Sequence, residues 1–265
     1  MQNELKTAPL KEKDRERFFD FLGKDEVRHI FTIYDLRHVS DKTRIWVATE
    51  GRRIFGYIFE FDKRIVHTRG TVGSVNRLLP YITLDELTFV IEPSHLTLVE
   101  QSFEPLEPTD ATSKGKITKY LVMKAEARSF KPIIRHKVKK LGQDDLEEVL
   151  RNFGEEWEKR VRDALERGMA YSAYDADAPV AIATVTETTD RIAFIRGVHT
   201  LPPFRDKGLA SSTVSALVKD ALRQKKEPVL WGAEDNLPAR RVYEKVGFKE
   251  TKHVLFGFKA RRRLN

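Results

Sequence analysis

The chain has 265 residues, 40% of them apolar, which is enough for two packed domains of ordinary size. It contains no cysteine, so disulfide bonds, thiolate metal ligands and a cysteine nucleophile are excluded. No apolar run approaches the roughly 20 residues that cross a bilayer, and residues 1–12 are too polar for a signal peptide. We therefore expect no membrane association and a cytoplasmic location.

The positive charge is concentrated in the second half of the chain. Residues 1–130 carry 21 basic and 20 acidic side chains, whereas residues 131–265 carry 27 and 20, so the net charge of +8 divides into +1 and +7. A polyanionic small molecule is a sufficient partner for such a surface. No nucleic-acid motif accompanies it, and we expect the clusters at 137–140 and 261–263 to be solvated surface.

The first half predicts two amphipathic helices, a strand hairpin with a third strand, a short helix, a strand, a helix that begins at a proline, and a closing strand. The helices are expected at 14–22, 27–36, 75–79 and 93–101, and the strands at 43–50, 53–61, 65–68, 87–91 and 117–124. Residues 104–110 are expected to form a loop.

The second half predicts the same order of elements. Strands are expected at 133–139, 169–174, 180–187, 192–200, 229–231 and 253–259, with a hairpin turn at 175–179. Helices are expected at 146–153 and 157–165, after a loop at 205–210 as far as Leu222, and from Pro238 onward. The last strand is expected to complete the second copy.

The two halves align at the point where a predicted helix ends and a phenylalanine follows. Ser102-Phe103 corresponds to Gly247-Phe248, an offset of 248 − 103 = 145 residues, and Leu98 then falls where Tyr243 stands. The first half lacks a counterpart of the loop at 205–210, because its candidate segment 70–74 has no arginine at the right place. We interpret the chain as two domains, 1–130 and 131–265, of which the first is a degenerate copy.

The loop between the central strand and the long helix has the features of a phosphate site. The N–H groups of a first helical turn have no partner within the helix and lie at the positive end of its dipole. Small residues at Gly208 and Ala210 let an anion approach the backbone, and Arg205 and Lys207 add positive charge. By itself such a loop is equally consistent with a tight turn before a helix.

Two motifs make the assignment more specific. The pattern Arg205-x-x-Gly208-x-Ala210 resembles the (Gln/Arg)-x-x-Gly-x-(Gly/Ala) signature of the GNAT superfamily of acetyl-CoA-dependent N-acetyltransferases. A second motif of that family, on the CoA side, is matched downstream by Asn236, Ala239, Tyr243, Gly247 and Phe248. The resemblance covers about residues 133–259.

The resemblance implies an α/β (α+β) fold, with two tandem GNAT-like domains that are each a mixed, mostly antiparallel sheet flanked by helices. It also implies that acetyl-CoA is the acetyl donor, with no metal, and that the cofactor arm pairs with strand backbone and its pyrophosphate binds the loop. The residues carried over for cofactor binding are Val198, His199, Thr200, Arg205, Asp206, Lys207, Gly208, Leu209, Ala210, Ser211, Asn236 and Tyr243.

Acetyl transfer to an amine needs a neutral amine, a positioned thioester and a protonated leaving thiolate. Tyr243 occupies the family's tyrosine position and is the expected proton donor, since a phenol with a pKa near 10 is protonated at neutral pH. Its alternative role is packing at a helix–sheet seam. Asn236 is expected to bind the cofactor arm or to cap the helix before Pro238.

Glu187 and His199 are the candidates for a general base, either directly or through water; each has an ordinary hydrogen-bonded role as its alternative. The sequence has Phe194 and Arg196 where some family members carry a carboxylate early in the central strand, so a single fixed base is not indicated.

The function expected from the resemblance is acetyl transfer to a primary amine, on a small molecule or a protein, with the first domain shaping the acceptor site. Two alternatives stay open. One is an acetyl-CoA-binding regulatory module without turnover, and the other is a nucleic-acid-binding protein that uses the basic second half.

Overall fold

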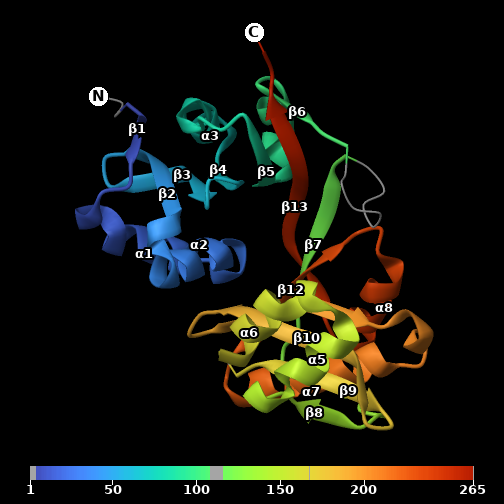
Figure 1. The fold of residues 1–265 in the computed structure, drawn as a ribbon. Helices are drawn as coiled ribbons and strands as arrows, with labels where there is room; N and C mark the ends of the chain where they lie inside the picture. The colour runs from blue at the N-terminus through green and yellow to red at the C-terminus, as the bar shows by residue number, and fades with distance from the viewer. Residues whose placement is uncertain (1–3, 108–115, 167, 265) are drawn as a thin grey trace. The chain divides into compact units, whose positions relative to one another are not determined.

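The computed structural model describes residues 4–107, 116–166 and 168–264. They form two compact units, each with strands and helices (Figure 1). Unit 1 comprises Met1–Leu121, Ala233–Asp235 and His253–Asn265, and unit 2 comprises Val122–Gly232 and Asn236–Lys252. In the part of the chain that is described, no helix is both long and apolar enough to cross a membrane.

Unit 1 has a mixed sheet whose strands follow the order β1-β2-β3-β4-β5-β13-β7, with β6 beside β13. Most neighbours are antiparallel, and β4 and β5 are parallel. The strands are β1 (Lys6–Pro9), β2 (Thr43–Glu50), β3 (Arg53–Phe61), β4 (Ile65–Gly70), β5 (Glu86–Ile91), β6 (Phe103–Pro105), β7 (Thr118–Lys124) and β13 (Lys249–Arg262). The helices are α1 (Arg15–Gly23), α2 (Glu26–His38), α3 (Val72–Leu78) and α4 (Leu96–Glu100), with the short helical turns η1 (Glu12–Asp14), η2 (Ser40–Lys42), η3 (Leu79–Tyr81) and η4 (Pro93–His95).

Helices cover both faces of the unit 1 sheet. Successive residues of a strand point to opposite faces. Tyr57 and Phe59 of β3 are buried in a core with Phe18, Leu22 and Ile33 of α1 and α2. The intervening residue of β3, Ile58, belongs to a second core with α3, α4 and β13. The hydrophobic periodicity of the helices therefore positions α1 and α2 on one face and α3 and α4 on the other.

Unit 2 has a sheet in the order β7-β12-β11-β10-β9-β8, in which β11 and β12 are parallel and β8 to β11 are antiparallel. Its further strands are β8 (Val138–Lys140), β9 (Ala170–Asp175), β10 (Ala178–Thr188), β11 (Ile192–Thr200) and β12 (Glu227–Ala233). The helices are α5 (Leu146–Phe153), α6 (Glu158–Glu166), α7 (Leu209–Arg223) and α8 (Leu237–Val246), with the short turns η5 (Gln143–Asp145), η6 (Glu155–Trp157) and η7 (Pro202–Phe204).

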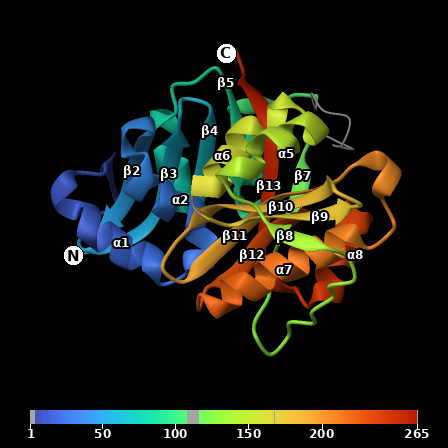
Figure 2. The ribbon, with the colours of Figure 1, turned by 60° about the horizontal axis from the view of Figure 1, so that its bottom comes forward.

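In unit 2 as well, helices lie on both sides of the strands, α5 and α6 on one side and α7 on the other (Figure 2). Ile182 of β10 packs in a core with Val149 of α5 and Val161 of α6. Its neighbour Ala181 packs with Leu209 of α7. Because adjacent strand residues face opposite ways, α5 and α6 cover one face and α7 covers the other.

The strands expected to close the two halves of the chain each pass from one unit to the other. Strand β13, which ends the second repeat, pairs with β5 along Phe256–Arg261 and buries Phe258 and Ala260 in the unit 1 core. Strand β7, which ends the first repeat, continues into unit 2 from Val122 and is followed there by the bond from Ala125 N–H to Pro228 O.

The expected order of elements is confirmed throughout the described residues, with four differences in detail. The strand expected at 133–139 is wrong for its first five residues, because Ile133 and Arg135 donate their backbone N–H groups to Ser215 and Ser212 of α7. Pro179, expected in a turn, lies in β10 opposite Tyr174.

The loop expected at 104–110 begins with strand β6, and its residues 108–110 lie outside the described part of the chain. The strand at 253–259 does not complete the sheet of the second copy, because it forms part of β13 in unit 1. Free backbone groups along a strand pair with any suitable edge, so a residue pattern does not specify the partner strand.

Candidate functional site

The parallel strands β11 and β12 of unit 2 are paired at one end. In the described residues their ladder has three pairs, Ile192–Glu227, Ala193–Pro228 and Phe194–Val229. On its other side, β11 continues to pair with β10 after Phe194, through Ile195, Arg196, His199 and Thr200. The backbone of β11 facing β12 is thus available to a ligand from Ile195 onward, at the carboxyl ends of two parallel strands.

A bulge in β11 follows directly. Gly197 has φ +65°, a conformation that side chains disfavour, and the pairing register with β10 shifts between Thr184–Arg196 and Ile182–His199. The hydroxyl of Thr184 donates a hydrogen bond of 2.7 Å to the carbonyl of Arg196 and holds the bulge in place. A lone glycine in a β-branched run is the sequence signal for this feature.

The bulge sets which backbone groups point toward β12. Leu201 donates its N–H to Val180 of β10, so by alternation His199 also faces β10, whereas Val198 and Thr200 face β12. The Thr200 hydroxyl oxygen is buried and has no hydrogen-bond partner within the described residues. A buried polar atom without a partner at this position fits a bound polar ligand.

The anion loop follows β11. The guanidinium of Arg205 donates from Nε to the Thr200 carbonyl at 3.1 Å, and Asp206 and Gly208 both have positive φ, of 63° and 84°. The imidazole of His136 donates from Nε2 to the Lys207 carbonyl at 2.8 Å. These contacts turn the chain sharply into α7, for which Gly208 is the N-terminal cap without a capping side chain.

The start of α7 has free N–H groups. The first bond within the helix is donated by Ser212 to Gly208, so the N–H groups of Leu209, Ala210 and Ser211 are not used by the helix. Arg205 and Lys207 are exposed beside them, as is Asp206. A Cβ on Gly208 would have no atom closer than His136 Nε2 at 3.7 Å, so the space above the loop is open. The residues present fit a pyrophosphate.

Helix α8 carries the second motif. Asn236 caps it by accepting a hydrogen bond of 3.2 Å from Ala239 N–H, so the capping alternative is realised. Tyr243 is buried, with 8% of its surface exposed, and its ring lies edge-on to Phe248 and 3.8 Å from the Cβ position of Gly232. Burial raises the pKa of Tyr243 to about 12, so the phenol is protonated at neutral pH.

The two candidate bases lie on the opposite face of the sheet from α7. Glu187 and Arg196 form an ion pair of 3.0 Å, and Glu187 also accepts a hydrogen bond of 2.5 Å from Thr186. His199 lies opposite Ile182 and therefore faces α5 and α6, where its ring is 5.3 Å from that of Trp157. Burial, followed by the positive charge of Arg205, lowers the pKa of His199, so the ring is neutral at neutral pH and able to accept a proton.

Two residues on this face were not singled out from the sequence. Trp157 ends the η6 turn, and Arg160 of α6 lies over its ring with 5.1 Å between the guanidinium carbon and the ring centre. Burial lowers the pKa of Arg160, as does the charge of Arg196, while Glu187 opposes them. Both residues occupy positions that an ordinary amphipathic segment would also fill, so the residue pattern does not mark them as functional.

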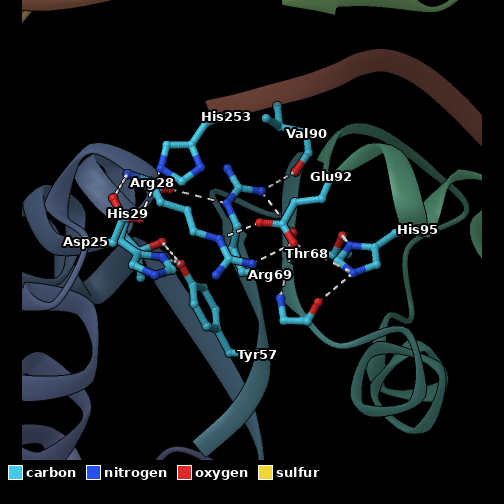
Figure 3. Close-up of polar contacts among 12 residues, drawn as sticks. Asp25, Arg28, His29, Tyr57, Thr68, Arg69, Val90, Glu92, His95 and His253 are labelled. Carbon is cyan, nitrogen blue, oxygen red and sulfur yellow. Dashed lines mark hydrogen bonds and ion pairs between the residues drawn. The ribbon is translucent and has the colours of Figure 1, made fainter. Parts of the chain in front are cut away.

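Unit 1 has a network of polar side chains at the corresponding ends of β4 and β5 (Figure 3). Arg28 forms two hydrogen bonds with Glu92, of 2.5 and 2.6 Å, and His95 bonds both Thr68 and the Gly70 carbonyl. The buried Arg69 donates to the carbonyls of residues 28, 68 and 90. Helix α3, which follows β4, is capped by the Thr71 hydroxyl accepting from Ser74 N–H.

The described residues contain no group of three or more His, Asp or Glu side chains arranged to hold a metal ion.

Comparisons with known proteins find a family model and solved structures that are similar to this chain. Residues 173–256 match the family model described as FR47-like protein, and no curated protein matches the sequence. The GCN5-related N-acetyltransferase from Sphaerobacter thermophilus superimposes with a TM-score of 0.66 at 14% identity, covering 97% of this chain and 95% of that one.

Two further solved structures are similar over nearly their whole length. A GNAT-family acetyltransferase from Colwellia psychrerythraea has a TM-score of 0.58 at 12% identity, over 96% of this chain and 99% of that one. A tandem GNAT protein from the clavulanic acid biosynthesis pathway has a TM-score of 0.57 at 14% identity, over 98% of each. The expected resemblance and fold class are confirmed: the chain has the fold of GNAT acetyltransferases, including a tandem one.

Proposed function

With the GNAT acetyltransferase fold as the premise, we propose that unit 2 transfers an acetyl group from acetyl-CoA to a primary amine. The observation that carries the proposal is the arrangement at the end of β11. A strand with unpaired backbone leads into a loop that presents three free N–H groups and two cations to an anion. This arrangement suits a ligand with an extended, amide-containing arm and a pyrophosphate.

In this proposal the predicted cofactor-binding residues have defined tasks, except His199, whose backbone faces β10. The backbone groups of Val198 and Thr200 pair with the arm, and the Thr200 hydroxyl supplies a further polar contact. The pyrophosphate binds the loop 205–208 and the first turn of α7, residues 209–211. The side chain of Asn236 caps α8, so we assign it a supporting role.

The proposed acetyl transfer replaces the C–S bond of the thioester with a C–N bond. The neutral amine attacks the thioester carbonyl carbon, a C–N bond forms, the C–S bond breaks, and the nitrogen loses a proton. The leaving sulfur gains a proton from the Tyr243 hydroxyl, which is then reprotonated from solvent. Starting from an ammonium ion, one proton is released to solvent for each acetyl group transferred.

His199 is the better placed of the two candidate bases. It is on the bulged strand, and its neutral ring can take a proton from the incoming ammonium through water. Glu187 is engaged by Arg196 and Thr186, so we assign it to holding Arg196. The engaged carboxylate is also the observation that favours the second candidate function, an acetyl-CoA-binding module without turnover.

We propose further that the first copy, residues 1–130, does not bind the cofactor, and that the second copy, 131–265, does. The support is chemical: α3 begins at a capping threonine, and the side chains of His95 and Glu92 bond the backbone of Gly70 at the end of β4.

The test is a thiol-release assay with acetyl-CoA and a panel of amines comprising polyamines, aminoglycosides, amino acids and peptides with free N-termini or lysines. The enzyme proposal expects at least one amine to be acetylated, with the product identified by mass. If acetyl-CoA binds and no class of amine is acetylated, the binding-module function is favoured and the proposed activity is wrong for these classes.

A further inference from the structure

We propose that the acceptor amine also carries a carboxylate, and that Arg160 of α6 binds this carboxylate. The inference rests on the proposed function, because it names the substrate class of the same site. It concerns unit 2 alone.

Arg160 is positioned beside the reacting strand. A Cβ placed on Gly197 would lie 2.6 Å from Arg160 Cδ and 3.3 Å from Trp157 Cζ3, so both side chains pack directly on the bulge. The next residue, Val198, points its backbone toward β12, where we place the thioester arm. The half-buried guanidinium of Arg160 is therefore next to the place at which an acceptor amine must arrive.

In the part of the chain that the structure describes, no carboxylate forms an ion pair with Arg160. Its neighbours on α6 are both paired, Lys159 with Asp163 at 3.1 Å and Arg162 with Glu158 at 2.8 Å. Within the described residues, Arg160 has no hydrogen bond to a carboxylate. Its side chain contacts Trp157 and the Gly197 bulge, and Glu187 acts on it as a nearby charge. A half-buried cation without an anionic partner is costly unless a ligand supplies one.

The nearby carboxylate is already neutralised. Glu187 forms its ion pair with Arg196 and accepts from the Thr186 hydroxyl. The group formed by Glu187, Arg196 and Arg160 thus has a net charge of +1, which is contributed by Arg160. An acceptor with one negative charge balances this site.

The shape of the group favours a carboxylate over a phosphate. A guanidinium presents parallel N–H donors that match the two oxygens of a carboxylate. The guanidinium carbon of Arg160 lies over the Trp157 ring, and its N–H groups have no carboxylate partner among the described residues, so they can bind a planar anion. A phosphate with two negative charges would exceed the one charge that is left unpaired.

The experiment measures binding before turnover. The CoA complex of the full chain is titrated calorimetrically with matched pairs, each an amino acid and its carboxamide, using the standard amino acids, β-alanine and γ-aminobutyrate. Phosphoethanolamine is included as the phosphate-bearing amine. We expect at least one amino acid to bind about 10- to 100-fold more tightly than its carboxamide, as for a charge-assisted bidentate pair.

The variant Arg160→Gln keeps most of the side-chain stem and removes the charge, and Arg160→Lys keeps the charge and removes the planar fork. Arg160→Gln should abolish the preference for the carboxylate, and Arg160→Lys should retain part of it. The matched control is Arg162→Ala, an exposed arginine of the same helix, which should bind like the wild type. Acetyl-CoA affinity and thermal unfolding of each variant are measured alongside.

The inference is overturned if every amino acid binds no better than its carboxamide, if phosphoethanolamine is the preferred amine, or if Arg160→Gln keeps the wild-type preference. The proposed function fails separately. If the carboxylate preference is present and depends on Arg160 while thiol release stays at background for the preferred amino acid, the carboxylate site stands and acetyl transfer to it does not.

Discussion

His95 donates a hydrogen bond of 3.0 Å from its Nε2 to the carbonyl oxygen of Gly70, the last residue of β4 in unit 1. Burial lowers the pKa of His95 against the opposing effect of this bond, so the neutral ring accepts at Nδ1 from the Thr68 hydroxyl at 2.8 Å. Glu92 accepts from Gly70 N–H at 3.5 Å. The side chains of His95 and Glu92 thus occupy backbone groups of Gly70. The corresponding backbone groups in unit 2, at the end of β11, have no strand partner.

We therefore predict that the full chain binds one equivalent of CoA, through unit 2. Gly208→Glu should weaken binding by at least 100-fold, because it places a negative charge at the pyrophosphate position. The measurement is calorimetric titration of the wild type and the variant.

The control for that variant is Gly208→Ala, which shares the strain of a side chain at φ +84° but adds no charge. It should lose much less affinity, since a Cβ there has open space. Two equivalents of CoA bound per chain would contradict the prediction that unit 1 does not bind CoA. Equal losses of CoA affinity in the two variants would mean that backbone strain, and not charge, weakens binding.

The second prediction concerns Tyr243. Tyr243→Phe should leave acetyl-CoA affinity and folding close to those of the wild type, because the ring that packs against Phe248 is kept. Turnover with an identified acceptor should fall by roughly 10²- to 10⁴-fold, the range for a positioned acid. Steady-state kinetics by thiol release measures the effect.

A matched control is Tyr174→Phe in β9, which also removes a buried phenol oxygen from unit 2. Its turnover should equal that of the wild type. A Tyr243→Phe enzyme with wild-type turnover across the pH range would remove the hydroxyl from the reaction.

The third prediction concerns the bulge. Gly197→Ala should destabilise the protein by roughly 2–4 kcal/mol, because it combines a positive φ with a Cβ placed 2.6 Å from Arg160 Cδ and 2.9 Å from Thr184 Oγ1. Gly73→Ala is the control, since Gly73 lies in α3 with nothing within 4 Å of its Cβ position. Thermal or urea unfolding should show that the control loses no stability or gains a little. If Gly197→Ala is as stable as the wild type, the strand is not bulged at this position.

The fourth prediction is a pH dependence of stability. Burial alone would raise the pKa of Glu92, but the hydrogen bonds from Arg28 and the charge of Arg69 outweigh it and lower the pKa below that of an ordinary glutamate. A depressed carboxyl pKa contributes stability above the unfolded-state pKa that is lost as pH falls through the folded-state value. The wild type should therefore lose stability as the pH is lowered below about 4.5.

Glu92→Gln should be less stable than the wild type at pH 7 by roughly 2–4 kcal/mol, since it leaves Arg28 without its carboxylate in a partly buried site. The difference should shrink toward acidic pH. Urea unfolding from pH 7 to pH 3 measures both curves, and parallel curves would contradict the assignment to Glu92.

The sequence by itself determined the order of helices and strands and the position of the anion loop. These features are local: helix periodicity, a strand of β-branched residues and a glycine at positive φ each act within a few residues. The central strand at 192–200 and the hairpin strands 43–50 and 53–61 have the predicted bounds. Asn236 also acts locally, as the cap of α8.

Only the tertiary structure decided which strands pair and which charges remain unpaired. Backbone groups of β13 can pair with any free strand edge, and the burial of Phe258 in the unit 1 core selects β5. Likewise, the exposed Arg162 has Glu158 within reach, whereas Arg160 is half-buried against Trp157 and forms no ion pair within the described residues. The energy of a charge depends on distances to groups far away in sequence, and folding alone sets those distances.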